Sequence, residues 1–419
     1  MLPFARLFAG SVSFRLAGLL LPVAFGSAAC VTIPRKPAPP TLLAQVAPVG
    51  FPSTVRFLGY DRDSYLKRAE ETFNRLGAAA EGGPIRVLAL SGGGAGGAFA
   101  AGALIGMTRR GERPQFHVVT GVSAGALIAP FAFLGPAWDD ELKEAFDSYR
   151  PSQLLQPRSW LAFLFLPGYY RGEPLVGLVD HFVTERLLQA VAEQAAQGRL
   201  LLVATTDLDK EESVIWDMGA IAAQGGEPAR QLFRDVLIAS ASIPGLFPPV
   251  LIQVEGGGNS YDEMHVDGGT TLSFFVTSEI ARQEKKHFPV LDRAQVFVLV
   301  NGQLSTYPET THQRPISVLA RSFSAGLRHA SRSSLELTAA FADRYDMDFR
   351  FTYVPVTYTF KGPLDFKFDS MHALFEYGAR CAEAGRIWTT LQQAINEALR
   401  AAATTSRQTD DCPVPNEGP

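Results

Sequence analysis

The sequence predicts an α/β fold with a mainly parallel central sheet and helices on both of its faces. From Ile85 onward, apolar runs of strand length alternate with helical patterns, which is typical of a sheet built from strand–helix–strand units. Residues 200–205 and 296–300 are almost continuously apolar, as parallel strands are when helices cover both faces. The chain has 419 residues, 47% of them hydrophobic, so it is long enough to bury such a core.

Each element is predicted from its local pattern. Apolar runs indicate the strands, and amphipathic stretches or stretches of small residues indicate the helices. We expect strands at residues 85–91, 116–120, 200–205, 213–217, 296–300 and 349–358, and a short strand that ends at residues 265–267. We expect helices at residues 61–76, 98–110, 124–134, 139–149, 185–197, 229–239, 316–345 and 370–402.

The N-terminus has the parts of a secretory signal peptide over residues 1–29. Arg6 and Arg15 supply the basic start, and an apolar stretch then leads through small residues to Cys30. The ending Ser-Ala-Ala-Cys resembles a bacterial lipobox, although Ser27 stands where an aliphatic residue is usual. We therefore expect an exported protein of the cell envelope that is lipid-anchored through Cys30. The alternatives are an ordinary cleaved signal peptide, which gives a periplasmic or secreted protein, and an uncleaved anchor.

The rest of the chain divides into three parts. Residues 30–60 are rich in proline and predict a tether. Residues 61–403 carry the alternating elements and predict one catalytic domain, with its motifs inside residues 85–270. Residues 404–419 are polar and predict a disordered tail.

Charge and cysteine content limit the possible partners. The net charge is −4, from 38 basic and 42 acidic residues, with no charged run, so nucleic acid is excluded as a partner. Cys381 and Cys412 can pair in an oxidising compartment or remain two free thiols, and the sequence leaves both open. The sequence carries no indication of an oligomeric state.

A candidate nucleophile follows the second expected strand. Gly121-Val122-Ser123-Ala124-Gly125 has the G-x-S-x-G pattern and opens a helix, which is the context of a nucleophile elbow. Gly121 and Gly125 permit the sharp turn, and Ser123 is then presented with its hydroxyl exposed. The alternative role for Ser123 is that of a helix N-cap.

A candidate oxyanion site lies in the glycine-rich turn after the first strand. Gly92, Gly93 and Gly94 present backbone N–H groups to a ligand, and such groups stabilise a developing oxyanion. A phosphate-binding P-loop is excluded because no lysine follows the glycines. A dinucleotide fingerprint with Gly92, Gly94 and Gly97 fits loosely and leaves Ser123 unexplained.

A candidate base comes at the end of a later strand. Asp267 precedes Gly268 and Gly269, which let other backbone approach the carboxylate. With an ordinary pKa of about 3.9, an aspartate must be desolvated to accept a serine proton efficiently. The alternative is a Ser-His-Asp triad, as in an esterase or thioesterase, and the candidate histidines for it are His265, His312, His329 and His372.

These motifs together resemble the patatin-like phospholipase family from about residue 87 to residue 269. The glycine loop 92–97, the G-x-S-x-G block and the Asp-Gly-Gly block match its three motifs, and residues 204–216 and 239–249 match two further blocks. The resemblance implies a three-layer α/β/α sandwich. It implies a Ser123–Asp267 dyad that hydrolyses acyl esters of phospholipids or lysophospholipids, without a metal or cofactor. The family usually has Lys or Arg where this chain has Gly96, so oxyanion stabilisation would here rest on backbone dipoles alone.

The substrate expected from this resemblance is a lipid acyl ester, met at a membrane surface. The apolar stretch 159–170 is either a lid or membrane-contacting wedge, or a helix of the core. A non-catalytic lipid-binding envelope protein is the alternative from outside the enzymes, and the intact motifs argue against it.

Overall fold

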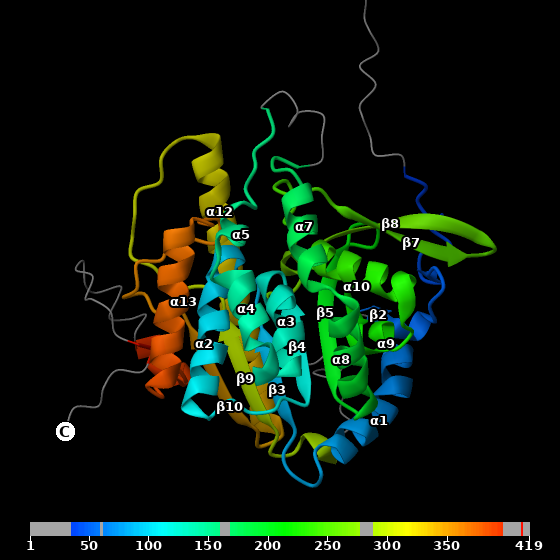
Figure 1. The fold of residues 1–419 in the computed structure, drawn as a ribbon, viewed down its shortest axis with the longest axis horizontal. Helices are drawn as coiled ribbons and strands as arrows, with labels where there is room; N and C mark the ends of the chain where they lie inside the picture. The colour runs from blue at the N-terminus through cyan, green and yellow to red at the C-terminus, as the bar shows by residue number, and fades with distance from the viewer. Residues whose placement is uncertain (1–34, 59–61, 160–167, 277–287, 397–411, 414–419) are drawn as a thin grey trace, which may run out of the picture.

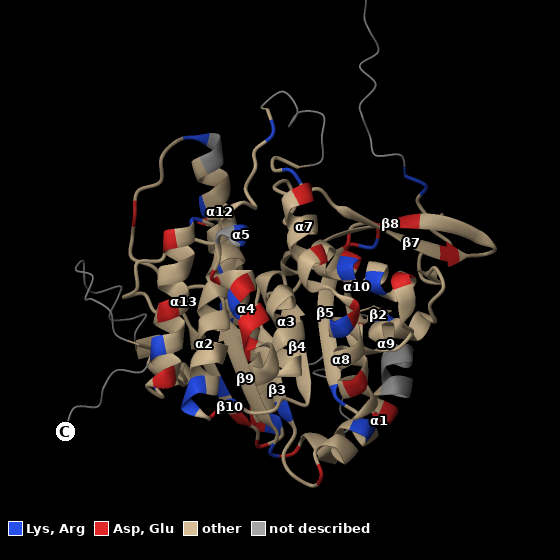
Figure 2. Ribbon diagram, in the orientation of Figure 1, with Lys and Arg blue, Asp and Glu red and all other residues tan. Residues whose placement is uncertain are grey.

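The computed structural model describes residues 35–58, 62–159, 168–276, 288–396 and 412–413. The expected signal peptide and Cys30 lie outside these residues, as do residues 160–167 of the apolar stretch. Within the part of the chain that is described, no helix combines the length and the apolar character that a membrane span requires. Figure 2 shows acidic and basic residues interspersed over the helices in this view.

The elements alternate along the chain as expected. The strands are β1 (Ala47–Pro48), β2 (Arg56–Leu58), β3 (Arg86–Leu90), β4 (Val118–Val122), β5 (Leu200–Asp207), β6 (Glu212–Asp217), β7 (Val250–Gly256), β8 (Asn259–Asp267), β9 (Gln295–Val300) and β10 (Asp348–Tyr353). The α-helices are α1 (Arg62–Ala79), α2 (Gly97–Arg110), α3 (Ala124–Leu134), α4 (Asp139–Phe146), α5 (Tyr149–Ser152), α7 (Glu173–Phe182), α8 (Glu185–Ala196), α9 (Met218–Ala222), α10 (Gly226–Ser240), α12 (Pro315–Arg344) and α13 (Phe368–Glu383).

All of these strands belong to one sheet, in the order β1-β7-β8-β5-β4-β3-β9-β10, with β6 beside β5 and β2 beside β6 (Figure 1). The five strands β10, β9, β3, β4 and β5 run parallel and form one half of the sheet, with β10 at its edge. Beyond β5 the pairs are antiparallel. The expected parallel sheet is thus present, and an antiparallel half extends it.

Both faces of the sheet are buried, which explains the continuous apolar runs. Successive residues of β3 point to opposite faces. Leu88 and Leu90 join one core cluster, whereas Val87 and Ala89 join another. Helices α2, α3 and α13 cover the first face, and α1 and α12 contribute to the second. The fold is therefore the three-layer α/β/α arrangement.

The N-terminal segment differs from the expected tether over residues 30–60. Ala47–Pro48 pair with β7, and Arg56–Leu58 pair with β6. Pro48 is tolerated in β1 because this strand lies at the edge of the sheet. The described part of this segment is thus fastened to the body instead of linking freely to it.

The C-terminal region also differs from expectation. The helix expected over residues 370–402 ends at Glu383, because Gly385 adopts a left-handed φ of 72° and terminates it. Cys412, in the expected disordered tail, is buried and forms a disulfide with Cys381. Of the two possibilities for these cysteines, the structure shows the disulfide, and most of residues 404–419 lie outside the described part.

Candidate active site

Strand β5 brings the two candidate catalytic residues together. Along one edge of β5, Ala204 pairs with Val122 at the end of β4, and the next residue, Thr205, pairs with Asp267 at the end of β8. Because β4 runs parallel to β5 and β8 runs antiparallel, the two strands point at one another and meet. The residue after β4 is Ser123, so it faces Asp267.

Ser123 occupies a strained turn between β4 and α3. Its backbone has φ 54° and ψ −124°, a region that costs a non-glycine residue about 1–3 kcal/mol. A Cβ on Gly125 would lie 2.4 Å from the Leu90 carbonyl oxygen, and a Cβ on Gly121 would lie 2.6 Å from the Gly125 carbonyl oxygen. Only glycine fits at both positions, which explains the spacing of the G-x-S-x-G motif.

The Asp267 carboxylate lies within hydrogen-bond distance of the serine hydroxyl. Ser123 Oγ donates to Asp267 Oδ2 at 2.6 Å, and the Gly269 N–H donates to Asp267 Oδ1 at 2.6 Å. Asp267 is 4% exposed and Ser123 is 5% exposed. Burial raises the pKa of Asp267 to about 7, against the opposing effect of these two hydrogen bonds. The carboxylate therefore has the basicity that a proton acceptor needs near neutral pH.

Two serines, Ser240 at the end of α10 and Ser242 just after it, support this pair, and no motif pattern marks either of them in the sequence. Ser240 Oγ accepts the Ser123 N–H at 3.0 Å and donates to the Ala204 carbonyl at 2.7 Å. The Asp267 N–H donates to the Ser242 carbonyl at 2.9 Å. One short segment thus holds the backbone at both candidate residues. The match of residues 239–249 to a family block was the only indication in the sequence.

The glycine loop offers two free N–H groups instead of the expected three. The Gly92 N–H donates to the Ser273 carbonyl at 3.0 Å, so it is not available to an oxyanion. Within the described residues, the N–H groups of Gly93 and Gly94 donate no hydrogen bond. Gly94 lines the same cavity as Ser123. The expected donors therefore reduce to Gly93 and Gly94.

An apolar cavity begins at Ser123. Apart from the serine, its walls are made by apolar side chains and glycine; they include Leu127 and Phe131 of α3, Phe146 of α4, Leu175 and Val179 of α7, Leu237 of α10, and Met371 of α13. The cavity holds about 70 Å³ in this state, so a long acyl chain requires the wall side chains to move apart. The absence of polar groups suits a hydrocarbon chain.

The candidate histidines do not complete a triad. His265 is buried, and its ring contacts Thr205 Oγ1 at 3.0 Å and Glu263 Oε2 at 3.3 Å. His372 contacts Asp147, and the side chains of His312 and His329 are exposed. None of the described histidines hydrogen-bonds to Ser123 or Asp267. The arrangement favours a dyad.

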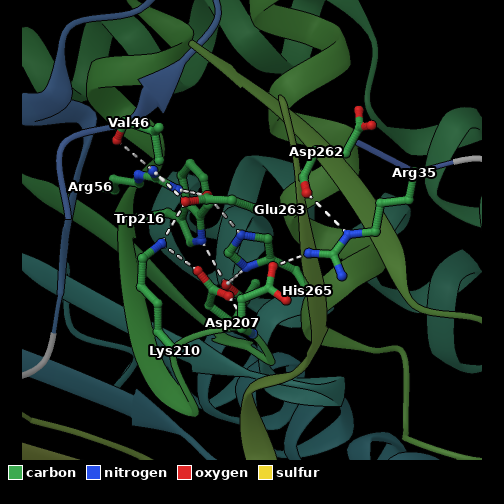
Figure 3. A network of polar contacts seen from close by, with 11 residues as sticks. Arg35, Val46, Arg56, Asp207, Lys210, Trp216, Asp262, Glu263 and His265 are labelled. Carbon is green, nitrogen blue, oxygen red and sulfur yellow. Dashed lines mark hydrogen bonds and ion pairs between the residues drawn. The ribbon is translucent and has the colours of Figure 1, made fainter. Parts of the chain in front are cut away.

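Figure 3 shows a buried charge network that includes Asp207 of β5 and Glu263 and His265 of β8, the strand that ends at Asp267. Asp207, Glu263 and His265 offer atoms of metal-ligand type within 4.8 Å of one another. Lys210 Nζ lies 2.5 Å from both Asp207 Oδ2 and Glu263 Oε1, and Arg56 pairs with Glu263. Burial raises the pKa of Glu263, but the hydrogen bond to His265 and the charge of Arg56 outweigh it and lower the pKa well below its usual range. Protein cations already neutralise these carboxylates, so the residues fit a closed ion-pair network better than a metal site.

The match to a family model agrees with this geometry. Residues 88–279 match the family model of the patatin-like phospholipases. Among solved structures, the chain resembles VipD from Legionella pneumophila, with 12% identity over 76% of this chain and 71% of that one and a TM-score of 0.32. No curated protein sequence matches the chain significantly. The family match includes both Ser123 and Asp267, and residues 88–279 are therefore a patatin-like phospholipase domain, the domain of a lipid acyl hydrolase.

Proposed function

We propose that the protein is a serine acyl hydrolase that cleaves acyl esters of phospholipids or lysophospholipids through a Ser123–Asp267 dyad. The observation that carries the proposal is the 2.6 Å hydrogen bond from Ser123 Oγ to a buried carboxylate with a pKa of about 7. The apolar cavity at Ser123 supports an acyl substrate. The free N–H groups of Gly93 and Gly94 support a reaction that passes through an oxyanion.

The chemistry follows from these positions. Ser123 Oγ attacks the ester carbonyl carbon while its proton passes to Asp267 Oδ2, and the N–H groups of Gly93 and Gly94 hold the oxyanion. When the intermediate collapses, the alcohol leaves with the proton from Asp267 and an acyl-enzyme remains. Water then attacks the acyl carbon and gives a proton to Asp267. Ser123 recovers this proton as the fatty acid is released.

The direct test is hydrolysis of a phospholipid mixture by the purified protein beside its Ser123→Ala variant. We expect the variant to lose activity by several orders of magnitude and to keep the folded circular dichroism spectrum, because the hydroxyl is the nucleophile. Full activity in Ser123→Ala would show that Ser123 is not the nucleophile and that the proposed dyad is wrong. Lipid binding without turnover of any acyl ester by the wild type would favour the non-catalytic alternative.

The triad alternative has its own test. His265→Ala, His312→Ala, His329→Ala and His372→Ala are assayed singly on the same substrates. We expect His312→Ala, His329→Ala and His372→Ala to retain activity within about tenfold. A loss of several orders of magnitude in one of these three would favour a triad and overturn the dyad. His265→Ala is interpreted together with its stability, since His265 belongs to the buried network.

We further propose that the protein is exported and is acylated at Cys30. The acylated protein would act at a membrane surface. The Cys381–Cys412 disulfide supports export, because structural disulfides persist in oxidising compartments. Metabolic labelling with palmitate should mark the wild type and not Cys30→Ser. Equal labelling of both would rule out Cys30 as the acylated residue.

A further inference from the structure

A second cavity, of about 610 Å³, has a wall that contacts the glycine loop through Pro363. Its walls come from the segment after β9, from the first half of α12 and from residues 356–365. In contrast to the apolar cavity, it contains three basic side chains, those of Arg321, Arg328 and Lys361. A polar and basic cavity of this size suits an anionic group better than a hydrocarbon chain.

Among the basic side chains of this cavity, Arg328 is the one with a buried polar atom that lacks a partner. Its Nε is buried and has no hydrogen-bond partner among the described residues, and its Nη2 makes only a long contact of 3.4 Å with Ser324 Oγ. Burial lowers the pKa of Arg328, and the positive charges of Arg332 and Arg321 lower it further. A guanidinium in these surroundings is stabilised when an anion binds beside it.

The acidic residues of the cavity do not neutralise Arg328. Glu309 pairs with Arg321 at 3.2 Å. Asp365 lines the cavity, and its Oδ2 is buried without a hydrogen-bond partner in the described structure. Lys361 Nζ has a neutral contact, with Ser370 Oγ at 3.4 Å. Arg328 and Lys361 are therefore the cationic groups that the cavity can offer to an anion.

The cavity wall and helix α12 are joined to the glycine loop through backbone and side-chain contacts. The Pro363 carbonyl, in its wall, accepts the Ala95 N–H of the glycine loop at 2.8 Å. On α12, Ser331 Oγ lies 2.6 Å from Ser273 Oγ, and the Ser273 carbonyl accepts the Gly92 N–H. The wall of the basic cavity thus contacts the glycine loop, and Gly94 of this loop lines the apolar cavity that begins at Ser123.

We propose that this cavity binds the phosphate of a phospholipid head group through Arg328 and Lys361 while the acyl chain of the same molecule enters the apolar cavity. The inference rests on the proposed acyl hydrolase function and adds a head-group site from residues outside the family match at 88–279. Phosphodiester oxygens would pair with the guanidinium of Arg328, which forms no ion pair with a carboxylate among the described residues. The glycine loop, which contacts the wall of the basic cavity and lines the apolar one, would then receive the ester.

The kinetic test compares two substrates that share an acyl chain and a glycerol. These are 1-palmitoyl-lysophosphatidylcholine and 1-monopalmitoylglycerol, and only the first carries a phosphate. We expect Arg328→Gln to lower kcat/KM for the phospholipid by about 10-fold to 100-fold, as charge-assisted hydrogen bonds are lost, and to leave the monoacylglycerol within about twofold. The matched control is Arg344→Gln, at the other end of the same helix, which should leave both substrates unchanged. Equal losses on both substrates, or no loss on the phospholipid, would overturn the head-group site.

A binding test separates this inference from the proposed function. Glycerophosphocholine and inorganic phosphate are titrated by calorimetry into Ser123→Ala protein and into the double variant with Arg328→Gln. We expect glycerophosphocholine to bind the single variant and to bind the double variant about tenfold more weakly or worse. If inorganic phosphate binds and glycerophosphocholine does not, the cavity takes free phosphate and the head-group assignment is wrong. Loss of catalysis with this binding intact would count against the hydrolase function alone.

Discussion

The substitution Asp267→Asn should abolish activity and at the same time stabilise the fold. Asparagine retains the size of the side chain, an acceptor for the Gly269 N–H and a group that can hydrogen-bond to Ser123, but it removes a buried negative charge. Burial raises the pKa of Asp267 from 3.8 to about 7. At about 1.36 kcal/mol for each pH unit, ionisation of this carboxyl costs the folded state about 4 kcal/mol.

The free-energy cost of burying Asp267 depends on pH and increases as the pH rises. Below about pH 4 the carboxyl is protonated in both the folded and the unfolded chain, so Asp267 carries no penalty. Between about pH 4 and pH 7 the unfolded chain releases the proton and the folded chain keeps it, and folding stability falls as the pH rises. Above about pH 7 both states are ionised and the full penalty remains.

The assay is urea unfolding of wild type and Asp267→Asn at pH 5, 6, 7 and 8. We expect the variant to be more stable at every pH, by an amount that grows from about 1–2 kcal/mol at pH 5 to about 4 kcal/mol at pH 8. In wild type, kcat/KM should fall about 100-fold from pH 8 to pH 5, because a base with a pKa of about 7 becomes protonated. A constant stability difference across this range, or a wild type that is the more stable protein, would refute the idea that Asp267 is a desolvated base.

Three further predictions concern the backbone and the disulfide. Ser123→Gly should be more stable to urea than Ser123→Ala by about 1–2 kcal/mol, because φ is 54° at this position; the reverse order would argue against a strained turn. Cys381→Ser should lower the free energy of unfolding by about 3–4 kcal/mol, because it removes the disulfide to Cys412, which closes a loop with a sequence separation of 31. Reductant should then have no effect on the thermal melt of this variant. Gly96→Ala should lower the free energy of unfolding by about 1–3 kcal/mol, because the new Cβ would lie 2.1 Å from the Asn301 carbonyl oxygen. If this variant melted at the wild-type temperature, the result would contradict this close packing.

The centre of the fold could be predicted because its strands are buried on both faces and its turns carry glycine. The helix expected at residues 124–134 coincides with α3. The hairpin strand β7 was missed, although exposed Gln253 and Glu255 alternate with buried Ile252 and Val254 in the amphipathic pattern of a strand. Strands β1 and β2 span two and three residues, too few for any periodicity to be visible. Their pairing depends on partners that are distant in sequence.

In the candidate site, too, features set by consecutive residues could be predicted, and features that depend on residues distant in sequence could not. Ser123 and Asp267 could be identified because local glycines prepare each turn, and a motif records that requirement in consecutive residues. The hydrogen bond of the Gly92 N–H could not be predicted, because its acceptor Ser273 lies in another part of the chain and no local pattern marks a backbone carbonyl as an acceptor. The role of Ser240 was hidden for a similar reason, since a buried serine at the end of a helix looks like packing until its partners are known.

The basic residue that the glycine loop lacks has a steric explanation. At Gly96 any side chain would meet the Asn301 carbonyl oxygen, and a Cβ on Gly93 would lie 2.0 Å from the same oxygen. Asn301 is held in turn by the loop, since its N–H and its side-chain amide donate to Ser91. The end of β9 therefore packs against the loop so closely that a cation cannot be carried there. In the head-group site that we propose, the positive charge for the substrate comes instead from another element, α12, whose Arg328 lines the neighbouring basic cavity.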